Sequence, residues 1–359
     1  MLVGDPRTAD RGIESVGLSS SRRASARSDG RCVVNTDLVL EARGLRKYFP
    51  TGASKMLQRP TDVVQAVDEV SFGLRRGTTL AIVGESGCGK STLGRLLARL
   101  IEPTAGSVLL DGKDITKASS RELLALRRDI QVVFQDPYAC LNPRHSIGQS
   151  IGTPIRIQKT LSRADEKARV RELMALVGLN PEHYNRFPHE FSGGQRQRAG
   201  IARALALQPK VIIADEPVSA LDVSIQAQIL NLMEDLQSSM GLSYVFIAHD
   251  LSVVRHIADQ VAVMYLGKIV EIGDPTAVYE RSAHPYTKAL LSAVPVADPK
   301  GAGERKRIVL SGDVPSPVNP PSGCRFRTRC PKAEARCAAE EPLLIERESG
   351  HQVACHFPL

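Results

Sequence analysis

The glycine-rich segment 84–91 carries the clearest chemical signal in this 359-residue chain. It matches the pattern G-x-x-x-x-G-K-[ST], with a strand-like run before it and a helical run after it. Its glycines let backbone N–H groups converge on phosphate oxygens, Lys90 places a cation on the β- and γ-phosphates, and Ser91 offers a hydroxyl to Mg²⁺. The segment therefore predicts a site for a nucleoside triphosphate. The residues expected to form it are Gly84, Glu85, Ser86, Gly87, Cys88, Gly89, Lys90, Ser91 and Thr92.

Cys88 lies inside this loop, where a cysteine is most often simply tolerated. A thiol near the N-terminus of a helix can also have a lowered pKa. On that hypothesis, thiol alkylation would block nucleotide binding.

Two adjacent acids, Asp215 and Glu216, follow the apolar run 211–214. A carboxylate at the end of a strand can reach the Mg²⁺ shell, which makes Asp215 the metal-side acid. Glu216 is then the natural general base or water-positioning residue for an attacking water. Alone, such a pair could be no more than the polar end of a strand; beside a phosphate loop it predicts hydrolysis.

Four of the seven cysteines lie in the last 36 residues, with the spacing C-x₅-C-x₆-C-x₁₇-C. Clustered cysteines in an intracellular chain suggest a metal, and four thiolates suit either Zn²⁺ or a [4Fe–4S] cluster. The spacing lacks a C-x₂-C knuckle, which disfavours a zinc ribbon. Free thiols or disulfides are the third interpretation, and His351 or His356 could replace one ligand. The set is Cys324, Cys330, Cys337 and Cys355.

The elements that must position these residues alternate between strands and helices, which indicates an α/β domain with a largely parallel sheet. The expected strands are 39–42, 79–83, 131–134, 211–214, 244–248 and 260–265. The expected helices include 91–100 and 225–240.

The chain divides by composition into three parts. Residues 1–37 are rich in Ser, Arg, Gly and Asp and are expected to be a disordered extension. Residues 38–285 form the α/β domain, with an all-helical insertion over about 137–207. Residues 286–359, rich in Pro, Gly and Cys, are expected to be a separate small appendage with little regular structure.

Composition excludes several classes of protein. Hydrophobic residues make up 42% and charged residues 24%, as in ordinary globular chains, and no apolar stretch of 18 residues occurs that could span a membrane. The net charge of +8 favours an anionic neighbour, either nucleic acid or the cytoplasmic face of a membrane. The absence of Trp leaves a base-stacking platform poorly supplied.

The segment 191–195, Phe-Ser-Gly-Gly-Gln, resembles the LSGGQ signature of ATP-binding-cassette (ABC) ATPases. The family's other motifs follow in order: Gln135 resembles the Q-loop glutamine, segment 219–222 the D-loop, and His249 the switch histidine. Phe49 resembles the aromatic residue that stacks on adenine, although Tyr48 could do the same. The resemblance implies a P-loop ABC ATPase fold, with a RecA-like core and antiparallel β and α-helical subdomains, plus a small Cys-rich C-terminal extension.

The resemblance also implies how the site works. Two cassettes sandwich two ATP molecules, and the signature segment of one closes over the γ-phosphate held by the other. The implied catalytic residues are Lys90, Gln135, Glu216 and His249, and the implied Mg²⁺ residues are Ser91, Gln135 and Asp215. The implied residues from outside the phosphate loop that contact nucleotide are Phe49, Gln135, Asp215, Ser192, Gly193, Gly194, Gln195 and Asp222.

Segments 135–144, 284–287, 315–317 and 323–331 resemble the dipeptide and oligopeptide importer branch. Segments 192–198 and 220–228 look closest to the second, F-type, of its two ATPase subunits. That implies a heterodimer with a sister ATPase on the cytoplasmic membrane face, beneath two permeases fed by an extracytoplasmic solute-binding protein. Segment 136–153 would receive the permeases, and the four cysteines would hold an iron–sulfur cluster. The alternatives are an importer of nickel chelates, glutathione or other small solutes, and a non-transport ATPase acting on nucleoprotein. No nucleic-acid partner is expected.

Overall fold

The computed structural model describes residues 37–51, 62–136, 140–293 and 308–359. These residues belong to one compact unit, which spans 35–359. The expected disordered extension 1–37 lies, apart from Asp37, outside the described residues. Residues 137–139 of the segment expected to meet the permeases also lie outside them.

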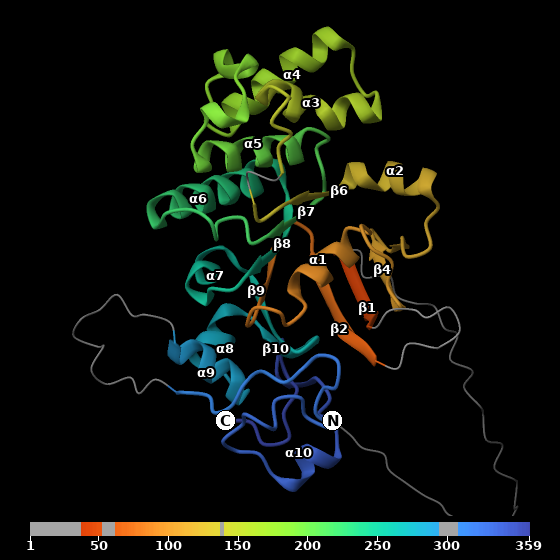
Figure 1. Cartoon of the computed structure of the whole chain (residues 1–359), viewed down its shortest axis with the longest axis vertical. Coiled ribbons are helices and arrows are strands. Elements are labelled where there is room, and N and C mark those ends of the chain that lie inside the picture. Colours follow the sequence, from red (N-terminus) through yellow and green to blue (C-terminus); the bar gives the residue numbers. More distant parts are fainter. Residues whose placement is uncertain (1–36, 52–61, 137–139, 294–307) are drawn as a thin grey trace, which may run out of the picture. The chain divides into compact units, whose positions relative to one another are not determined.

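An eight-stranded main sheet runs through the molecule (Figure 1). In spatial order its strands are β11 (Ile345–Glu348), β12 (His351–Val353), β10 (Lys268–Gly273), β9 (Gln260–Tyr265), β3 (Thr79–Val83), β8 (Ser243–Ala248), β7 (Val211–Asp215) and β6 (Ile130–Val133). The five strands from β9 to β6 are parallel, while β10, β12 and β11 continue the sheet in antiparallel pairs. All six expected strands are present, five of them in this sheet.

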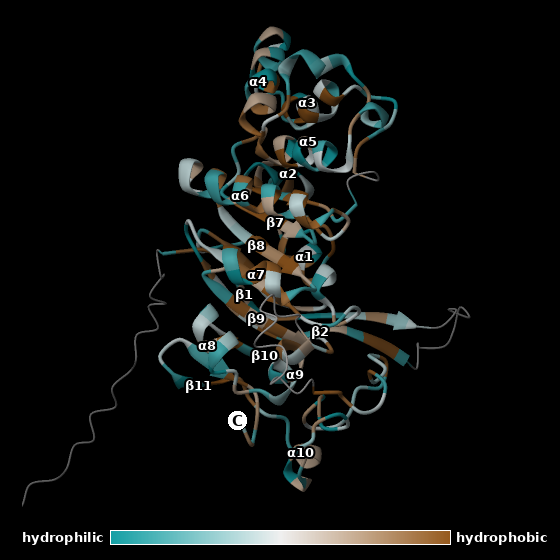
Figure 2. Cartoon of the chain, turned by 90° about the vertical axis from the view of Figure 1, so that its left-hand side faces the viewer, coloured by the Kyte–Doolittle hydropathy of each residue, from teal (hydrophilic) through white to brown (hydrophobic). Residues whose placement is uncertain are grey.

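The parallel strands are apolar on both faces, because both faces are covered (Figure 2). Leu80 and Ile82 of β3 pack with helix α1 (Lys90–Leu97) and a second sheet. Ala81 and Val83 point the other way and join the core shared with α6 (Val223–Met240) and α7 (Leu251–Ile257). Successive side chains of β3 thus alternate between the two faces. Because the phosphate loop follows Val83, the last residue of β3, it lies at the carboxyl edge of the parallel strands.

The second sheet is antiparallel, with the order β2-β1-β4-β5. Its strands are β1 (Leu38–Thr51), β2 (Asp62–Arg75), β4 (Ala105–Leu110) and β5 (Lys113–Asp114). The apolar pattern of the sequence indicated residues 39–42 of β1 and none of β2. Register shifts in the β1–β2 pair, between Ala42 and Leu45 and again between Leu45 and Lys47, interrupt the simple alternation that marks a strand in sequence.

Helices fill the chain between β6 and β7, and no strand occurs in the described residues 140–207. They are α3 (Ile147–Gln158), α4 (Arg163–Leu176), the 3₁₀ turns Pro181–Asn185 and Pro188–Glu190, and α5 (Gly193–Leu205). A further helix, α2 (Ser120–Asp129), precedes β6. Capping boxes start α3 at Ser146 and α5 at Ser192, so both helix starts are specified locally by a Ser with a Gln three residues later.

The C-terminal residues do not stand apart as expected. After α8 (Pro275–Glu280) and α9 (Pro285–Ala293), the chain forms α10 (Ala335–Ala339) and returns as β11 and β12, and β12 pairs with β10 of the main sheet. His351 Nε2 lies 2.8 Å from Glu271 Oε1, and Glu271 is fully buried. Strand pairing and this buried contact are long-range features, which composition cannot reveal.

Among the helices of the described residues, none combines the length and the apolar character that a membrane span requires.

Candidate functional site

The phosphate loop is held in a conformation that requires glycine. Gly89 has φ +107°, and a Cβ there would lie 2.0 Å from the carbonyl oxygen of Ala66. A Cβ at Gly84 would lie 2.1 Å from the Met264 carbonyl. The ammonium of Lys90 is buried inside the loop and donates to the carbonyl oxygens of Gly84 (2.7 Å) and Glu85 (3.0 Å). The loop is therefore closed around its own lysine, which is aimed at the place where phosphates are expected.

A cavity of about 600 Å³ opens over this loop and brings together predicted residues from distant parts of the chain. Phe49 lines it, whereas the Tyr48 hydroxyl donates to Asp68 Oδ1 at 2.6 Å. Of the two aromatic candidates, Phe49 is thus the one that lines the cavity. The predicted residues that line the cavity are Phe49, Ser86, Gly87, Gly89, Lys90, Ser91, Thr92, Gln135, Glu216 and His249.

The two acids at the end of β7 have different partners. The Ser91 hydroxyl donates to Asp215 Oδ1 at 2.9 Å, so the two groups expected to share Mg²⁺ already meet. Burial raises the pKa of Asp215, with a further contribution from the neighbouring Glu216 charge, and the Ser91 hydrogen bond opposes the rise. A bound divalent cation would favour the ionised carboxylate and offset the cost of burying it.

Two polar side chains that follow the neighbouring strands β6 and β8 contact the Glu216 carboxylate. Gln135 Nε2 donates to Glu216 Oε2 at 2.8 Å, and His249 Nδ1 lies 3.5 Å from the same oxygen. Glu216 has φ +48°, an unusual conformation for a residue other than glycine, and its N–H donates to the carbonyl of Ile247 at 3.0 Å. Backbone strain concentrated at a carboxylate in a cavity is typical of functional sites.

The signature segment lies elsewhere in the molecule. Ser192 caps α5, where its hydroxyl accepts from the Gln195 N–H and the Gln195 side chain accepts from the Ser192 N–H. Gly194 packs closely against Ile225 of α6, which begins after Asp222. The described residues that line the nucleotide cavity include neither the segment 192–195 nor Asp222.

The lowered thiol pKa considered for Cys88 is wrong. The side chain is 4% exposed, and burial raises the pKa of this thiol, with only partial opposition from the Lys90 charge. Burial thus outweighs the Lys90 charge and the backbone hydrogen bonds that favour the thiolate, and the proposed reactivity of Cys88 loses its physical basis.

The four C-terminal cysteines line one small cavity together with His284 and Phe326. Burial raises the pKa of Cys324 to about 11, and the neighbouring charges of Cys355, Cys337 and Cys330 add to the rise. The cysteines in the described ranges are free of disulfides. Within those ranges, no group of three or more His, Cys, Asp or Glu side chains is placed to hold a metal ion.

Sequence reasoning missed how closely the C-terminal residues approach the phosphate loop. Arg329 Nη1 donates to Glu85 Oε2 at 2.9 Å, and the Glu85 N–H donates to the Tyr286 hydroxyl at 2.9 Å. The Pro317 carbonyl accepts from the Gln65 N–H at 3.0 Å, and Pro317 lines the nucleotide cavity. These contacts join residues more than 200 positions apart, and no local pattern could have indicated them.

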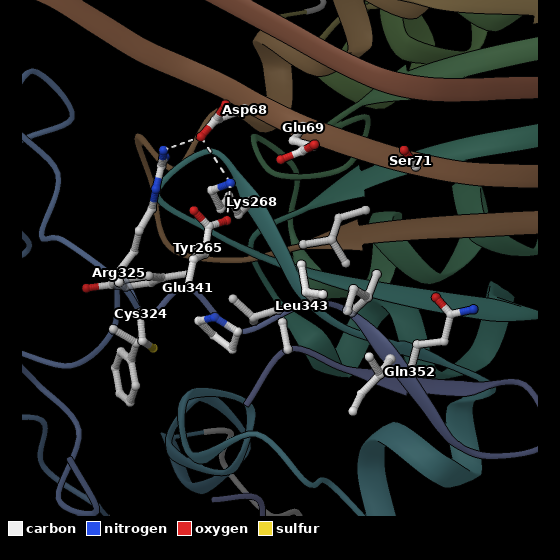
Figure 3. A pocket seen from close by; sticks show the side chains of 18 residues that line it. Asp68, Glu69, Ser71, Tyr265, Lys268, Cys324, Arg325, Glu341, Leu343 and Gln352 are labelled. Carbon is white, nitrogen blue, oxygen red and sulfur yellow. Dashed lines mark hydrogen bonds and ion pairs between the residues drawn. The ribbon is translucent and has the colours of Figure 1, made fainter. Parts of the chain in front are cut away.

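A second set of contacts secures the C-terminal residues to strand β2 (Figure 3). Arg325 donates to Asp68 and, at 2.6 Å, to Gln65 Oε1. Lys268 Nζ lies 3.0 Å from the same Asp68 carboxylate. The side chains of Arg325 and Asp68 are only 8% and 10% exposed, so removing either partner would leave the other charge buried and unpaired by this contact.

A parallel sheet with a phosphate loop after β3, a carboxylate pair at the end of β7 and a cavity over the loop defines a P-loop nucleoside triphosphatase. Residues 67–219 match the family described as ABC transporter, and residues 270–337 match the oligopeptide/dipeptide transporter C-terminal region. The chain belongs to the ABC transporter ATPases, among the ATP-binding subunits of its oligopeptide and dipeptide branch. The resemblance of the sequence to this family is therefore confirmed.

The relatives and solved structures agree with this placement. The chain is 54% identical over 324 residues to the oligopeptide transport ATP-binding protein AppF of Bacillus subtilis, covering 90% of this chain and 98% of that protein. It is 52% identical to the dipeptide transport ATP-binding protein DppF of Escherichia coli, covering 88% and 93%. Among solved structures, the dimeric cassette MJ0796 bound to ADP and phosphate aligns with a TM-score of 0.58 at 27% identity, covering 66% and 98%.

Proposed function

We propose that this chain is the ATP-hydrolysing subunit that powers import of di- and oligopeptides through a pair of membrane permeases. The observation that carries the chemistry is the convergence of Gln135 and His249 on the Glu216 carboxylate, in the cavity above Lys90. The names of the relatives support peptides as the cargo. Nickel chelates, glutathione and other small solutes remain the alternative cargoes of the same machine.

In this proposal the chain's own residues have distinct tasks. The loop N–H groups and Lys90 bind the phosphates, Ser91, Asp215 and Gln135 would hold Mg²⁺, and Phe49 packs on the base. Glu216 accepts the proton of the attacking water, Gln135 and His249 orient that carboxylate, and His249 also contacts the γ-phosphate. When bound, Mg²⁺ supplies positive charge to the phosphate oxygens; the remaining catalysis is positioning and charge stabilisation.

The signature segment would act on a second cassette. Ser192 and Gln195 lie away from this chain's own nucleotide cavity, so a complete site needs the α5 N-terminus of a partner. The dimeric state of the solved cassette relative supports that arrangement. We infer a heterodimer with a sister ATPase, set against two permeases at the cytoplasmic membrane face and fed by a solute-binding protein.

We also propose that Cys324, Cys330, Cys337 and Cys355 hold a [4Fe–4S] cluster. They share one cavity, and His284, which lines it, keeps Nε2 buried without a hydrogen-bond partner among the described residues. Four thiolates suit either a [4Fe–4S] cluster or Zn²⁺, and their spacing, which lacks a C-x₂-C knuckle, disfavours a zinc ribbon. The cluster would staple the C-terminal residues, which build little core of their own.

The iron content of anaerobically purified protein tests the cluster. We expect about four iron and four acid-labile sulfide per chain, as the composition of a [4Fe–4S] group requires. The Cys330→Ser/Cys355→Ser variant should lose both, whereas Cys140→Ser, outside the set, should keep them. Stoichiometric zinc without iron would replace the cluster by a zinc site.

Recovery of partners from native membranes tests the transport function. Tagged Glu216→Gln protein should be captured with ATP in mild detergent, because blocked hydrolysis is expected to prolong the assembled state. Mass spectrometry should then identify two permeases, a sister ATPase and a solute-binding protein, whose affinity for peptides can be measured directly. Recovery of ribosomal or DNA-repair proteins, with no membrane protein, would contradict an importer.

A further inference from the structure

The phosphate loop carries one carboxylate, Glu85, whose backbone carbonyl accepts from the Lys90 ammonium at 3.0 Å, although Glu85 is not among the described residues that line the nucleotide cavity. Its side chain is 25% exposed, so solvent screens its charge only in part. An unpaired negative charge there would repel the triphosphate that the neighbouring Lys90 must bind. In the structure, the positive charge that pairs with Glu85 comes from the C-terminal residues.

Arg329, in the C-terminal residues, is the group that pairs with Glu85. Its Nη1 lies 2.9 Å from Glu85 Oε2, and the arginine side chain is only 10% exposed. Within the described residues this is the one ion pair that Glu85 makes. The contact spans 244 positions of sequence, so it exists only when the C-terminal residues are docked.

The same loop residue is held a second time, by its backbone. The Glu85 N–H donates to the hydroxyl of Tyr286, a residue of α9 that is fully buried. The Tyr286 ring packs against Tyr265 and Phe326, with ring centroids 4.6 Å and 5.4 Å apart. Phe326 lies three positions before Arg329, and the Arg329 N–H donates to its carbonyl at 3.0 Å. A packed aromatic cluster thus supports both contacts to Glu85.

We propose that Arg329 is a positioning residue of the ATP site: it holds the Glu85 carboxylate and cancels its charge beside the phosphates. The C-terminal residues are then part of the nucleotide site and not only an appendage. This inference rests on the proposed assignment of Gly84–Ser91 as the phosphate loop.

A double-mutant cycle at this pair gives four proteins in three charge states. The wild type and the Arg329→Gln/Glu85→Gln double variant carry no net charge at the pair. Arg329→Gln leaves a negative charge, and Glu85→Gln leaves a positive one. If charge cancellation is the role of Arg329, the affinity for ATP follows the charge of the pair and not the presence of the arginine.

The measurement is the Kd of the full chain for a fluorescent ATP analogue with Mg²⁺, together with steady-state hydrolysis. We expect Arg329→Gln to raise the Kd and KM about 10-fold with kcat within about twofold, because ground-state binding is what the repulsion weakens. Glu85→Gln should lower the Kd, and the double variant should return to within about twofold of the wild type. Arg329→Lys should keep most of the affinity, and 1 M salt should reduce all of these differences.

Control variants distinguish a protein that does not fold, a wrong role for Arg329 and a wrong assignment of the phosphate loop. Arg336→Gln removes an exposed arginine, paired with Glu340 at 2.9 Å, and should leave the Kd unchanged. If Arg329→Gln does not fold, the comparison of Arg329→Lys with Arg329→Lys/Glu85→Gln asks the same question. A double variant as weak as Arg329→Gln alone, or no change in Arg329→Gln, would overturn the inference. ATP binding that survives Lys90→Ala would instead overturn the phosphate-loop assignment on which it rests.

Discussion

Replacing Glu216 with Gln is expected to lower the rate of ATP hydrolysis by at least about 100-fold, the range of a lost general base. The substitution keeps the shape of the side chain and its hydrogen-bonding capacity toward Gln135 and His249, so the cavity should stay intact. Only the ability to take a proton from water is removed. ATP binding should therefore persist while phosphate release, measured with a coupled fluorescent sensor, nearly stops.

The same variant is expected to accumulate as a closed dimer in the presence of ATP, because hydrolysis is what would normally reopen it. Light scattering after size-exclusion chromatography, with ATP and then with ADP, measures this directly. Glu280→Gln, a change at an exposed position on α8, is the matched control and should hydrolyse ATP at the wild-type rate. Hydrolysis by Glu216→Gln near the wild-type rate would show that another group activates the water.

Replacing Lys90 with Ala is expected to lower hydrolysis at a different stage, by weakening nucleotide binding itself. The buried ammonium now donates to two carbonyls of the loop, and it is the cation nearest to the expected phosphates. Charge-assisted hydrogen bonds to phosphate are among the stronger polar contacts, so we expect the Kd for ATP to rise at least about 10-fold. Fluorescent-nucleotide titration is the measurement.

Lys117→Ala, at an exposed position outside the cavity, is the control for this variant and should bind ATP normally. The two predictions are distinguishable because Glu216→Gln retains ATP and Lys90→Ala does not. A Lys90→Ala protein that binds ATP as well as the wild type would place the nucleotide elsewhere in the molecule.

The phosphate loop and the carboxylate pair could be predicted from sequence because each is encoded locally. A strand, a glycine-rich turn and a helix start follow one another without interruption over residues 79–97, and the apolar run before Asp215 is itself a buried strand. The P-loop fold and the ABC family followed from such contiguous motifs. The parallel strands were also predictable, since each is a short apolar run covered on both faces.

The tertiary structure alone decided which of these motifs meet. The order of strands in the sheet, β3-β8-β7-β6, is not their order along the chain. Because β6, β7 and β8 are neighbours, Gln135 and His249, which follow β6 and β8, both reach the Oε2 atom of Glu216, which follows β7. The tertiary structure also places Phe49 in the cavity while Tyr48 bonds to Asp68, and it buries the Cys88 thiol.

The C-terminal residues show most clearly what composition and local motifs do not specify. Their composition suggested an independent, cysteine-stapled appendage, yet they add strands to the main sheet and place Arg329 on the phosphate loop. Sequence determines motifs whose residues are neighbours along the chain, because local backbone geometry suffices to form them. Contacts such as Arg329–Glu85 depend on how strands pair and surfaces pack, and only the folded chain specifies them.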